Sequence, residues 1–267
     1  MHELFKYDRR HKRAIRDRMK IEKEGVMQRV EIDGKTVYIP DGADPKVLAK
    51  TYFQIYFINN NHYYDIAEME IKKGDIVLDG GASEGYFTQK ALDCGAAKVY
   101  CVEPATALIP CLEKTFADEI ASGRVVLACC VFGNRNTVVG FLENRTDPRA
   151  GHISDAAQTK DKSIPAAEIP MFTIDEFCNQ HSIQKLDFIK ADVEGAEIDL
   201  LCGAEKTIRH LKPAIAIAVY HKPENANRIL AFIEELSLNY AIRVKGIREF
   251  PGDKIPRPVM VHCYQKQ

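Results

Sequence analysis

The sequence lacks three features that mark disulfide-linked, zinc-binding or membrane proteins. None of its eight cysteines forms a C-x-x-C pair, and Cys101, Cys129 and Cys130 lie inside apolar runs, where a free cysteine behaves as a small buried hydrophobe. This pattern argues against a disulfide framework or a zinc site and favours a reducing cytoplasm. The N-terminus has no apolar segment, and no window approaches the roughly 18 apolar residues of a membrane span. We therefore expect neither a signal peptide nor a membrane span.

The chain also lacks an excess of either charge. Its 37 basic and 38 acidic residues give a formal net charge of -1, so the whole molecule has no bulk attraction for nucleic acid or an acidic membrane. Residues 1–24 are the exception, with nine basic residues against five acids. We interpret them as a solvated charged helix and keep a basic arm that contacts RNA as the alternative. The basic residues are Lys6, Arg9, Arg10, Lys12, Arg13, Arg16, Arg18, Lys20 and Lys23.

Two parts are expected within the 267 residues. Residues 1–70 predict an N-terminal extension that caps the substrate side: the basic helix, a β-hairpin over 30–39 around Asp33-Gly34, and an aromatic-rich helical segment over 45–70. The aromatic cluster could line a substrate pocket, but we favour a role in the core. Residues 71–267 predict the main domain, interrupted by a polar, turn-rich insertion at 144–170 that suits a lid or a mobile segment.

Apolar runs and helical segments alternate through the main domain. This rhythm predicts an α/β fold in three layers, with a mostly parallel, Rossmann-like sheet covered on both faces. The last two strands have no helix between them, so we expect an antiparallel C-terminal strand, unlike the continued alternation of a dinucleotide-binding fold. Strands are predicted at 75–79, 99–103, 125–131, 137–143, 186–191, 214–220, 240–247 and 258–264, and helices at 85–94, 106–121, 196–210 and 225–237.

The turn from Asp79 to Gly85, Asp-Gly-Gly-Ala-Ser-Glu-Gly, predicts a cofactor pocket at the end of a buried strand. A dinucleotide fingerprint needs a glycine where Ala82 stands. A carboxylate at Asp79 suits an amino-acid-bearing cofactor better than a pyrophosphate. Glu103 ends the next strand and precedes Pro104, where a carboxylate can accept hydrogen bonds from both hydroxyls of a ribose. Glu103 fits either S-adenosylmethionine or NAD.

A second polar group follows the strand at 186–191. Asp192 and Glu194 are expected at the same sheet edge as Asp79 and Glu103, where an acid could hold a sulfonium-bearing group, orient a hydroxyl or accept its proton. The acids could also bind a divalent cation, although we assign no metal ligand from the sequence. His221 follows the strand at 214–220 and is a candidate general base or acceptor-orienting group. Glu197 is interpreted as a complement to the helix dipole.

Weaker interpretations concern four other histidines. His152, inside the insertion, could approach the pocket from a lid, and His62, His181 and His210 are interpreted as surface or helix residues.

These motifs resemble a known family. "IVLDGGASEGYF" (76–87) and "VYCVEP" (99–104) look like the start of a class I S-adenosylmethionine-dependent methyltransferase. "LDFIKADVEGAEIDLLCGAEKTI" (186–208) and "KPAIAIAVYHKPEN" (212–225) are more specific, and are similar to FkbM-type methyltransferases. The resemblance covers roughly residues 70–225 and none of residues 1–60.

The resemblance implies methyl transfer from S-adenosylmethionine, usually to oxygen on a sugar or natural product. It implies catalytic roles for Asp192, Glu194 and His221. Ser83 departs from the pattern, where asparagine is common, and so does Cys129-Cys130 before the adenine. The implied cofactor-binding residues are Asp79, Gly80, Gly81, Ala82, Ser83, Tyr86, Phe87, Glu103, Pro104, Cys130 and Asp192.

The leading hypothesis is therefore a cytoplasmic O-methyltransferase acting on a carbohydrate or small molecule. The alternatives are an RNA methyltransferase that uses the basic arm, an NAD-dependent oxidoreductase or epimerase, and a non-catalytic interaction protein. Ala82 and the final strand pair argue against the NAD enzyme, and the net charge disfavours nucleic acid. The acceptor and the oligomeric state, a dimer included, stay open.

Overall fold

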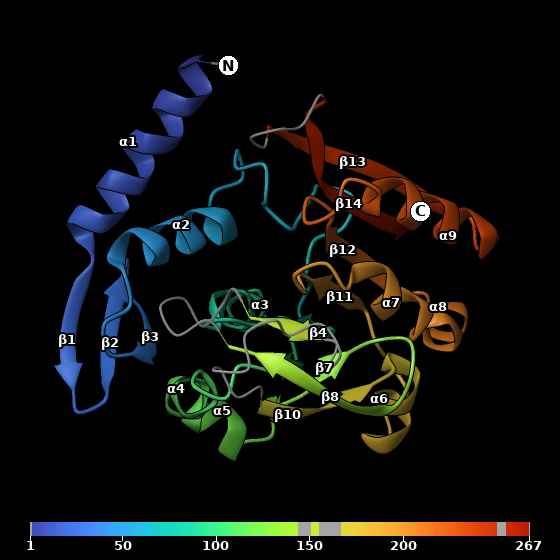
Figure 1. Ribbon diagram of the computed structural model, residues 1–267, viewed down its shortest axis with the longest axis horizontal. Coiled ribbons are helices and arrows are strands. Elements are labelled where there is room, and N and C mark those ends of the chain that lie inside the picture. The colour runs from blue at the N-terminus through green and yellow to red at the C-terminus, as the bar shows by residue number, and fades with distance from the viewer. Residues whose placement is uncertain (1, 144–150, 155–166, 250–254, 267) are drawn as a thin grey trace.

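A seven-stranded sheet forms the centre of the molecule in a computed structural model, which describes residues 2–143, 151–154, 167–249 and 255–266 (Figure 1). Its strand order is β13-β14-β12-β11-β4-β5-β6. The strands from β12 to β6 run parallel, and β14 is antiparallel to both of its neighbours. This confirms the predicted fold class. The strands are β4 (Ile76–Gly80), β5 (Lys98–Val102), β6 (Val125–Ala128), β11 (Phe188–Ala191), β12 (Ala214–Ala218), β13 (Tyr240–Arg248) and β14 (Arg257–Gln265).

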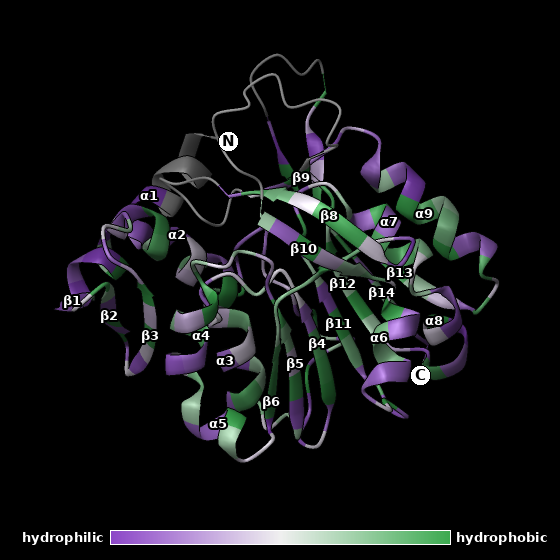
Figure 2. Cartoon of the chain, turned by 60° about the horizontal axis from the view of Figure 1, so that its bottom comes forward, coloured by the Kyte–Doolittle hydropathy of each residue, from purple (hydrophilic) through white to green (hydrophobic). Residues whose placement is uncertain are grey.

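Alternate residues of the central strands pack into two separate hydrophobic cores. Val77 of β4 and Phe188 of β11 pack in one cluster of buried residues, and their neighbours Leu78 and Ile189 pack in the other. This is the period of two that a strand imposes on its side chains. Figure 2 shows helices on both sides of the apolar strands, which makes three layers. The helices are α3 (Tyr86–Asp93), α4 (Ile109–Thr115), α5 (Ala117–Ala121), α6 (Ile174–Gln180), α7 (Glu197–Cys202), α8 (Glu205–Leu211) and α9 (Asn225–Glu235).

Two predicted helices are each divided in two. The segment at 106–121 breaks at Phe116, whose φ of -111° leaves the helical range. The segment at 196–210 breaks near Gly203, where an added Cβ would come within 2.0 Å of the carbonyl oxygen of Gly133. A tight packing contact therefore accompanies this second break.

The N-terminal segment differs from its prediction. Helix α1 (His2–Arg18) ends early, and β1 (Lys20–Glu24) pairs antiparallel with β2 (Met27–Ile32), which pairs with β3 (Lys35–Pro40). The hairpin around Asp33-Gly34 is confirmed, but it belongs to a three-stranded sheet. Gly25, with φ +66°, supplies the turn that lets residues 20–24 join it. The Arg18 guanidinium donates to both Asp33 carboxylate oxygens, at 2.8 and 2.9 Å, and ties the helix to the hairpin.

Only the first half of the aromatic segment is helical. Helix α2 (Pro45–Tyr56) begins with Asp44 as its N-cap. It ends before the three asparagines at 59–61, and Asn60 accepts a hydrogen bond from the backbone N–H of His62 at 2.8 Å. Such local bonds compete with helix formation. Elements on the two sides of residue 70 contact each other, α2 with α3 and β3 with α4. The division into two domains at residue 70 stays a prediction.

A second, four-stranded sheet crosses the carboxyl side of the main one, in the order β7-β10-β8-β9. The predicted strand at 137–143 is present as β8 (Thr137–Leu142), and the predicted strand at 125–131 is split between β6 and β7 (Val131–Phe132). Two strands that the sequence did not predict lie within the insertion or at its end, β9 (His152–Ser154) and β10 (Ala167–Phe172). Its residues 144–150 and 155–166 lie outside the described residues. Across the described chain, no helix is long and apolar enough to cross a bilayer.

Candidate active site

A cavity of about 450 Å³ opens where β4, β5, β11 and β12 end. This volume falls in the range of roughly 300–1,000 Å³ that small-ligand sites occupy. Among the described residues, Asp79 and Gly80 do not line the cavity, although the sequence placed them there. The predicted residues that do line it are Gly81, Ala82, Ser83, Tyr86, Phe87, Glu103, Pro104, Cys130, Asp192, Glu194 and His221.

The glycine turn brings the chain very close to the neighbouring strand. Gly81 has a φ of +74°, and a Cβ built on it would lie 2.0 Å from the carbonyl oxygen of Asp192. The backbone N–H groups of Gly81 and Ala82 both donate to the carbonyl of Val102, at 3.0 Å. Only glycine fits such an approach in this conformation. The turn therefore forms one cavity wall and leaves no space between β4 and the Asp192 backbone.

Asp79 lies beneath the turn, in the protein interior. Its side chain is fully buried, 3.0 Å from the Lys190 ammonium, and the Thr88 hydroxyl donates to its other oxygen at 2.7 Å. Lys190 also donates to the carbonyl oxygens of Gly80 and Gly81. Burial acts to lower the pKa of Lys190, but the Asp79 and Asp192 carboxylates outweigh it and raise that pKa. Asp79 thus holds a buried cation that supports the turn.

Sequence reasoning missed Lys190. It lies directly opposite Asp79 in the parallel register of β11 and β4. The sequence did contain a signal for this pair: one apolar strand holds a lysine and another holds an aspartate. Because a buried charge needs a partner, this pattern indicates a buried ion pair.

Glu103 stands at the end of β5 and faces the cavity. Its two oxygens accept hydrogen bonds from the backbone N–H groups of Ser83 and Ala105, at 2.7 and 2.9 Å. Burial raises the pKa of Glu103 to about 7, against the lowering effect of these two bonds. Each oxygen keeps a second lone pair, so the carboxylate can still accept from a vicinal diol.

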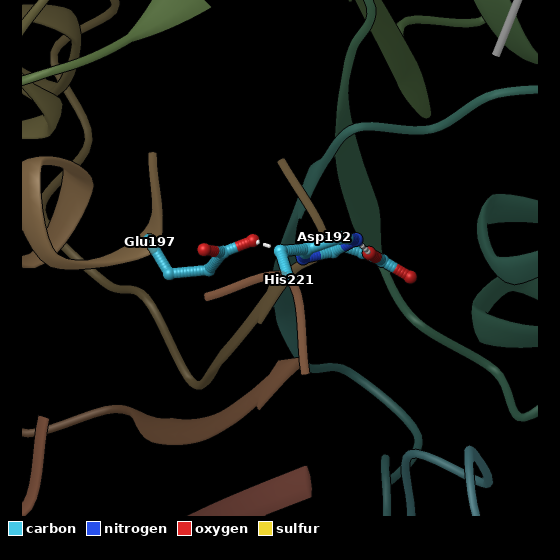
Figure 3. Close-up of side chains that lie close together, drawn as sticks. All are labelled: Asp192, Glu197 and His221. Carbon is cyan, nitrogen blue, oxygen red and sulfur yellow. Dashed lines mark hydrogen bonds and ion pairs between the residues drawn. The ribbon is translucent and has the colours of Figure 1, made fainter. Parts of the chain in front are cut away.

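Asp192, Glu194 and Glu197 surround the imidazole of His221. Figure 3 shows the ring between Glu197 and Asp192. Nδ1 lies 2.7 Å from Glu197 Oε1, whereas Nε2 lies 3.4 Å from Asp192 Oδ1 and 3.5 Å from Glu194 Oε2. Burial acts to lower the pKa of His221, but the nearby carboxylates of Glu194, Glu197 and Asp192 outweigh it and raise that pKa to about 10. In the absence of a bound ion the three carboxylates favour the protonated ring, which does not favour a general base.

Glu197 has a different role from the one that its helix position indicated. Although it is the first residue of α7, its side chain is fully buried. Besides facing His221, it accepts from Asn225 Nδ2 at 2.7 Å and from the Gly195 N–H at 3.1 Å. The helix-dipole interpretation thus missed a contact that orients His221.

Tyr64 reaches the same group from the N-terminal segment. Its hydroxyl donates to Asp192 Oδ2 at 2.6 Å. Burial acts to raise the pKa of Asp192, but the charges of His221 and Lys190 and the Tyr64 bond outweigh it and lower that pKa. Tyr64 itself is buried but lines the cavity, so the core and pocket interpretations of the aromatic segment both apply to it.

Two histidines outside this group were also considered from the sequence. His152 lines the cavity from β9, as the lid interpretation expected. His62 is half-buried: its ring packs edge-on against Tyr220 at 5.0 Å, and burial lowers its pKa to about 3.

Comparison with known proteins decides the family. The Methyltransferase FkbM domain model matches residues 79–241. The chain belongs to the FkbM methyltransferase domain family. No curated protein matches it in sequence. The predicted resemblance to this family is confirmed.

One solved structure of an FkbM methyltransferase shares the fold. The FkbM methyltransferase from Methylobacillus flagellatus is 20% identical, with a TM-score of 0.55; the match covers 80% of this chain and 48% of that one. This chain therefore spans about half the length of that FkbM protein. Precorrin-6y C5,15-methyltransferase from Geobacter metallireducens is 12% identical, with a TM-score of 0.40. The match covers 75% of this chain and 85% of that one. TYW2 from M. jannaschii, in complex with AdoMet, is 14% identical, with a TM-score of 0.43. The match covers 91% of this chain and 87% of that one.

Proposed function

We propose that this FkbM protein uses S-adenosylmethionine to methylate a hydroxyl group on a sugar or another small molecule. The observation that carries the proposal is that two chemically different groups line one cavity: the Glu103 carboxylate, and the cluster of Asp192, Glu194 and His221. The first suits the ribose of the donor, and the second suits an acceptor hydroxyl that must lose a proton.

The donor occupies the side of the cavity formed by the glycine turn. Glu103 accepts from both ribose hydroxyls, and the backbone of Gly81, Ala82 and Ser83 surrounds the methionine portion. The aromatic rings of Tyr86 and Phe87 line the same wall. Pro104 and Cys130 flank the adenine. Asp79 contributes indirectly, by holding Lys190 beneath the turn.

The acceptor hydroxyl lies beside Asp192 and Glu194. Because the sulfonium already activates the methyl group, the protein mainly supplies proximity, in-line orientation and proton removal. The bond from the methyl carbon to the acceptor oxygen forms as the carbon–sulfur bond breaks, and its electron pair stays on sulfur. The hydroxyl proton passes to a carboxylate. Glu194, whose side chain is 45% exposed, is best placed to receive it, and His221 orients the pair.

Donor binding is tested by titrating the chain with S-adenosylhomocysteine and with NAD in a calorimeter. We expect only S-adenosylhomocysteine to bind, and Glu103→Gln to weaken it by roughly 10-fold or more, since one charge-assisted hydrogen bond contributes about 1.5–3 kcal/mol. Glu113→Gln, on the exposed face of α4, is the matched control and should leave the affinity unchanged. Binding of NAD alone would refute the proposal.

Catalysis is tested with labelled S-adenosylmethionine and a panel of sugar and small-molecule hydroxyls. In the double variant Asp192→Asn, Glu194→Gln we expect donor affinity to remain and methyl transfer to fall by about 100-fold or more. Undiminished turnover would show that these carboxylates do not remove the proton.

RNA is not favoured as the acceptor, because ion pairs occupy part of the basic segment. Arg18 pairs with Asp33, Lys20 with Glu31 and Lys23 with Asp41. These pairs reduce the charge available to phosphates.

A further inference from the structure

One ring nitrogen of His221 is buried without a hydrogen bond. The side chain is 9% exposed, and neither Nε2 nor the buried Oδ1 of Asp192 has a hydrogen-bond partner. The two atoms face each other across 3.4 Å, and Glu194 Oε2 lies 3.5 Å from the same nitrogen. Unpaired buried polar atoms are costly and call for an explanation, such as an ion.

The separation of these atoms suits two ligands of one metal ion better than a hydrogen bond. Hydrogen bonds from nitrogen to oxygen are usually about 2.7–3.2 Å long. Consider two ligand atoms that each lie about 2.1 Å from the same cation. They are about 3.0 Å apart if the ligand–metal–ligand angle is a right angle, and about 3.4 Å apart if it is tetrahedral. The distance of 3.4 Å between Nε2 and Oδ1 falls in that interval.

The other ring nitrogen is already held as it is in metal-binding histidines. Nδ1 lies 2.7 Å from Glu197, whose carboxylate is itself fixed by Asn225 and by the Gly195 N–H. A ligating histidine commonly donates its second N–H to a carboxylate, which fixes the tautomer and the ring orientation. Nε2 is then left as the metal-binding atom.

Charge favours a cation at the same place. Asp192, Glu197 and His221 bring ligand atoms within 4.8 Å of one another. Both Glu197 oxygens are engaged in hydrogen bonds, so it acts as the outer partner. Glu194, with its exposed side chain, supplies a mobile third carboxylate.

We propose that His221 Nε2 and Asp192 Oδ1, with Glu194 as a third ligand, bind a divalent cation of the Mn²⁺ type. One imidazole and two carboxylates form a mixed nitrogen and oxygen set. Carboxylates suit Mg²⁺, Ca²⁺ and Mn²⁺, and imidazole suits the transition metals, so Mn²⁺ fits both. The ion takes the place of the Nε2 proton, and its remaining positions are open to water or a ligand.

The role of the cation, but not its binding, rests on the proposed methyl transfer. An acceptor hydroxyl at an open position has a lowered pKa. With the ion bound, the hydroxyl proton leaves to water instead of to Glu194 while the oxygen takes the methyl group from sulfur, which gives the methyl ether, S-adenosylhomocysteine and one proton. Glu194 is then a metal ligand, and the metal ion replaces it as the group that activates the hydroxyl.

Binding is tested directly by titrating the full chain with Mn²⁺ at neutral pH and following the electron paramagnetic resonance signal of the free ion. We expect one saturable site. Asp192→Asn and Glu194→Gln should each weaken it by at least 10-fold, and Glu197→Gln by about 10–100-fold, although it removes no ligand. His210→Ala and Glu234→Gln, both exposed on helices, are the matched controls and should bind as the unchanged protein does.

Binding of S-adenosylhomocysteine with and without EDTA separates this inference from the proposed function. If the donor product binds in EDTA but Mn²⁺ does not bind, the metal site is overturned and the methyltransferase proposal stands. If Mn²⁺ binds but Glu194→Gln and Asp192→Asn leave its affinity unchanged, the ligand assignment is wrong. Thermal unfolding of each variant without metal shows that it is folded, and Glu194→Gln changes an exposed side chain that the fold does not need.

Discussion

Gly81→Ala is the substitution whose cost follows most directly from the geometry. The new Cβ would lie 2.0 Å from the Asp192 carbonyl oxygen, and real Cβ atoms essentially never approach closer than 3.0 Å. The end of β11 must therefore move by at least 1.0 Å, the difference between those two distances. That movement weakens the bond from the Asp192 N–H to the Gly80 carbonyl, now 3.1 Å long, and the bond from Tyr64 to Asp192.

The magnitude follows from these contacts. The left-handed conformation at φ +74° costs alanine about 1–2 kcal/mol. Loss of the backbone bond adds about 1 kcal/mol, and loss of the bond to a charged group about 1.5–3 kcal/mol. A less flexible unfolded chain returns about 0.4–1 kcal/mol. We expect the free energy of unfolding to fall by about 4 kcal/mol.

Gly123→Ala is the matched control, because Gly123 has almost the same φ, +73°, with nothing within 4 Å of an added Cβ. It should cost about 1 kcal/mol or less, since only the backbone terms apply. Urea unfolding of both variants measures the difference, and calorimetry with S-adenosylhomocysteine tests whether Gly81→Ala also loses donor affinity. If both variants are equally stable, the close approach of β4 to Asp192 is not as described.

Two further predictions concern buried charges. Lys190→Met leaves Asp79 buried without its partner, so the free energy of unfolding should fall by about 3–5 kcal/mol. Lys185→Met removes an exposed lysine from a half-buried Asp187 and should cost less than about 1 kcal/mol. Similar costs of the two substitutions in urea unfolding would contradict the role given to the buried pair. The pKa of Glu103 rises from 4.5 to about 7 on folding, so the stability linked to its proton is complete below pH 4.5 and is lost as the pH rises through 7. Between pH 4.5 and pH values above 7, the free energy of unfolding of the unchanged protein should therefore decrease by about 3 kcal/mol more than that of Glu103→Gln. Parallel pH profiles of the two proteins in urea unfolding would refute the prediction.

The sequence was sufficient for the parts of the fold that depend on local pattern. Apolar runs identified the strands of the main sheet, and the missing helix between β13 and β14 identified the antiparallel end. The second sheet was not readable in this way. Its parallel pair β7 and β10 joins Val131 to Met171, and such distant pairing leaves no periodic signal in either segment.

The site was predictable to the level of the sheet edge, but not to the level of contacts. Asp79, Glu103 and Asp192 all end strands, yet Asp79 turns inward to Lys190 while Glu103 lines the cavity. The direction of a side chain depends on strand register and on what lies opposite. Tyr64 is 128 residues from its partner Asp192, so no local pattern could have joined them.

Asp192 links the two halves of the site mechanically. Its carbonyl oxygen lies against Gly81 in the donor turn, and its side chain accepts from Tyr64 and faces His221. Packed interiors transmit small displacements because they have few voids. A shift of the glycine turn therefore moves the Asp192 carboxylate, which we propose to lie beside the acceptor. The glycine turn tolerates no Cβ at residue 81 because the backbone that carries the Asp192 carboxylate occupies that space.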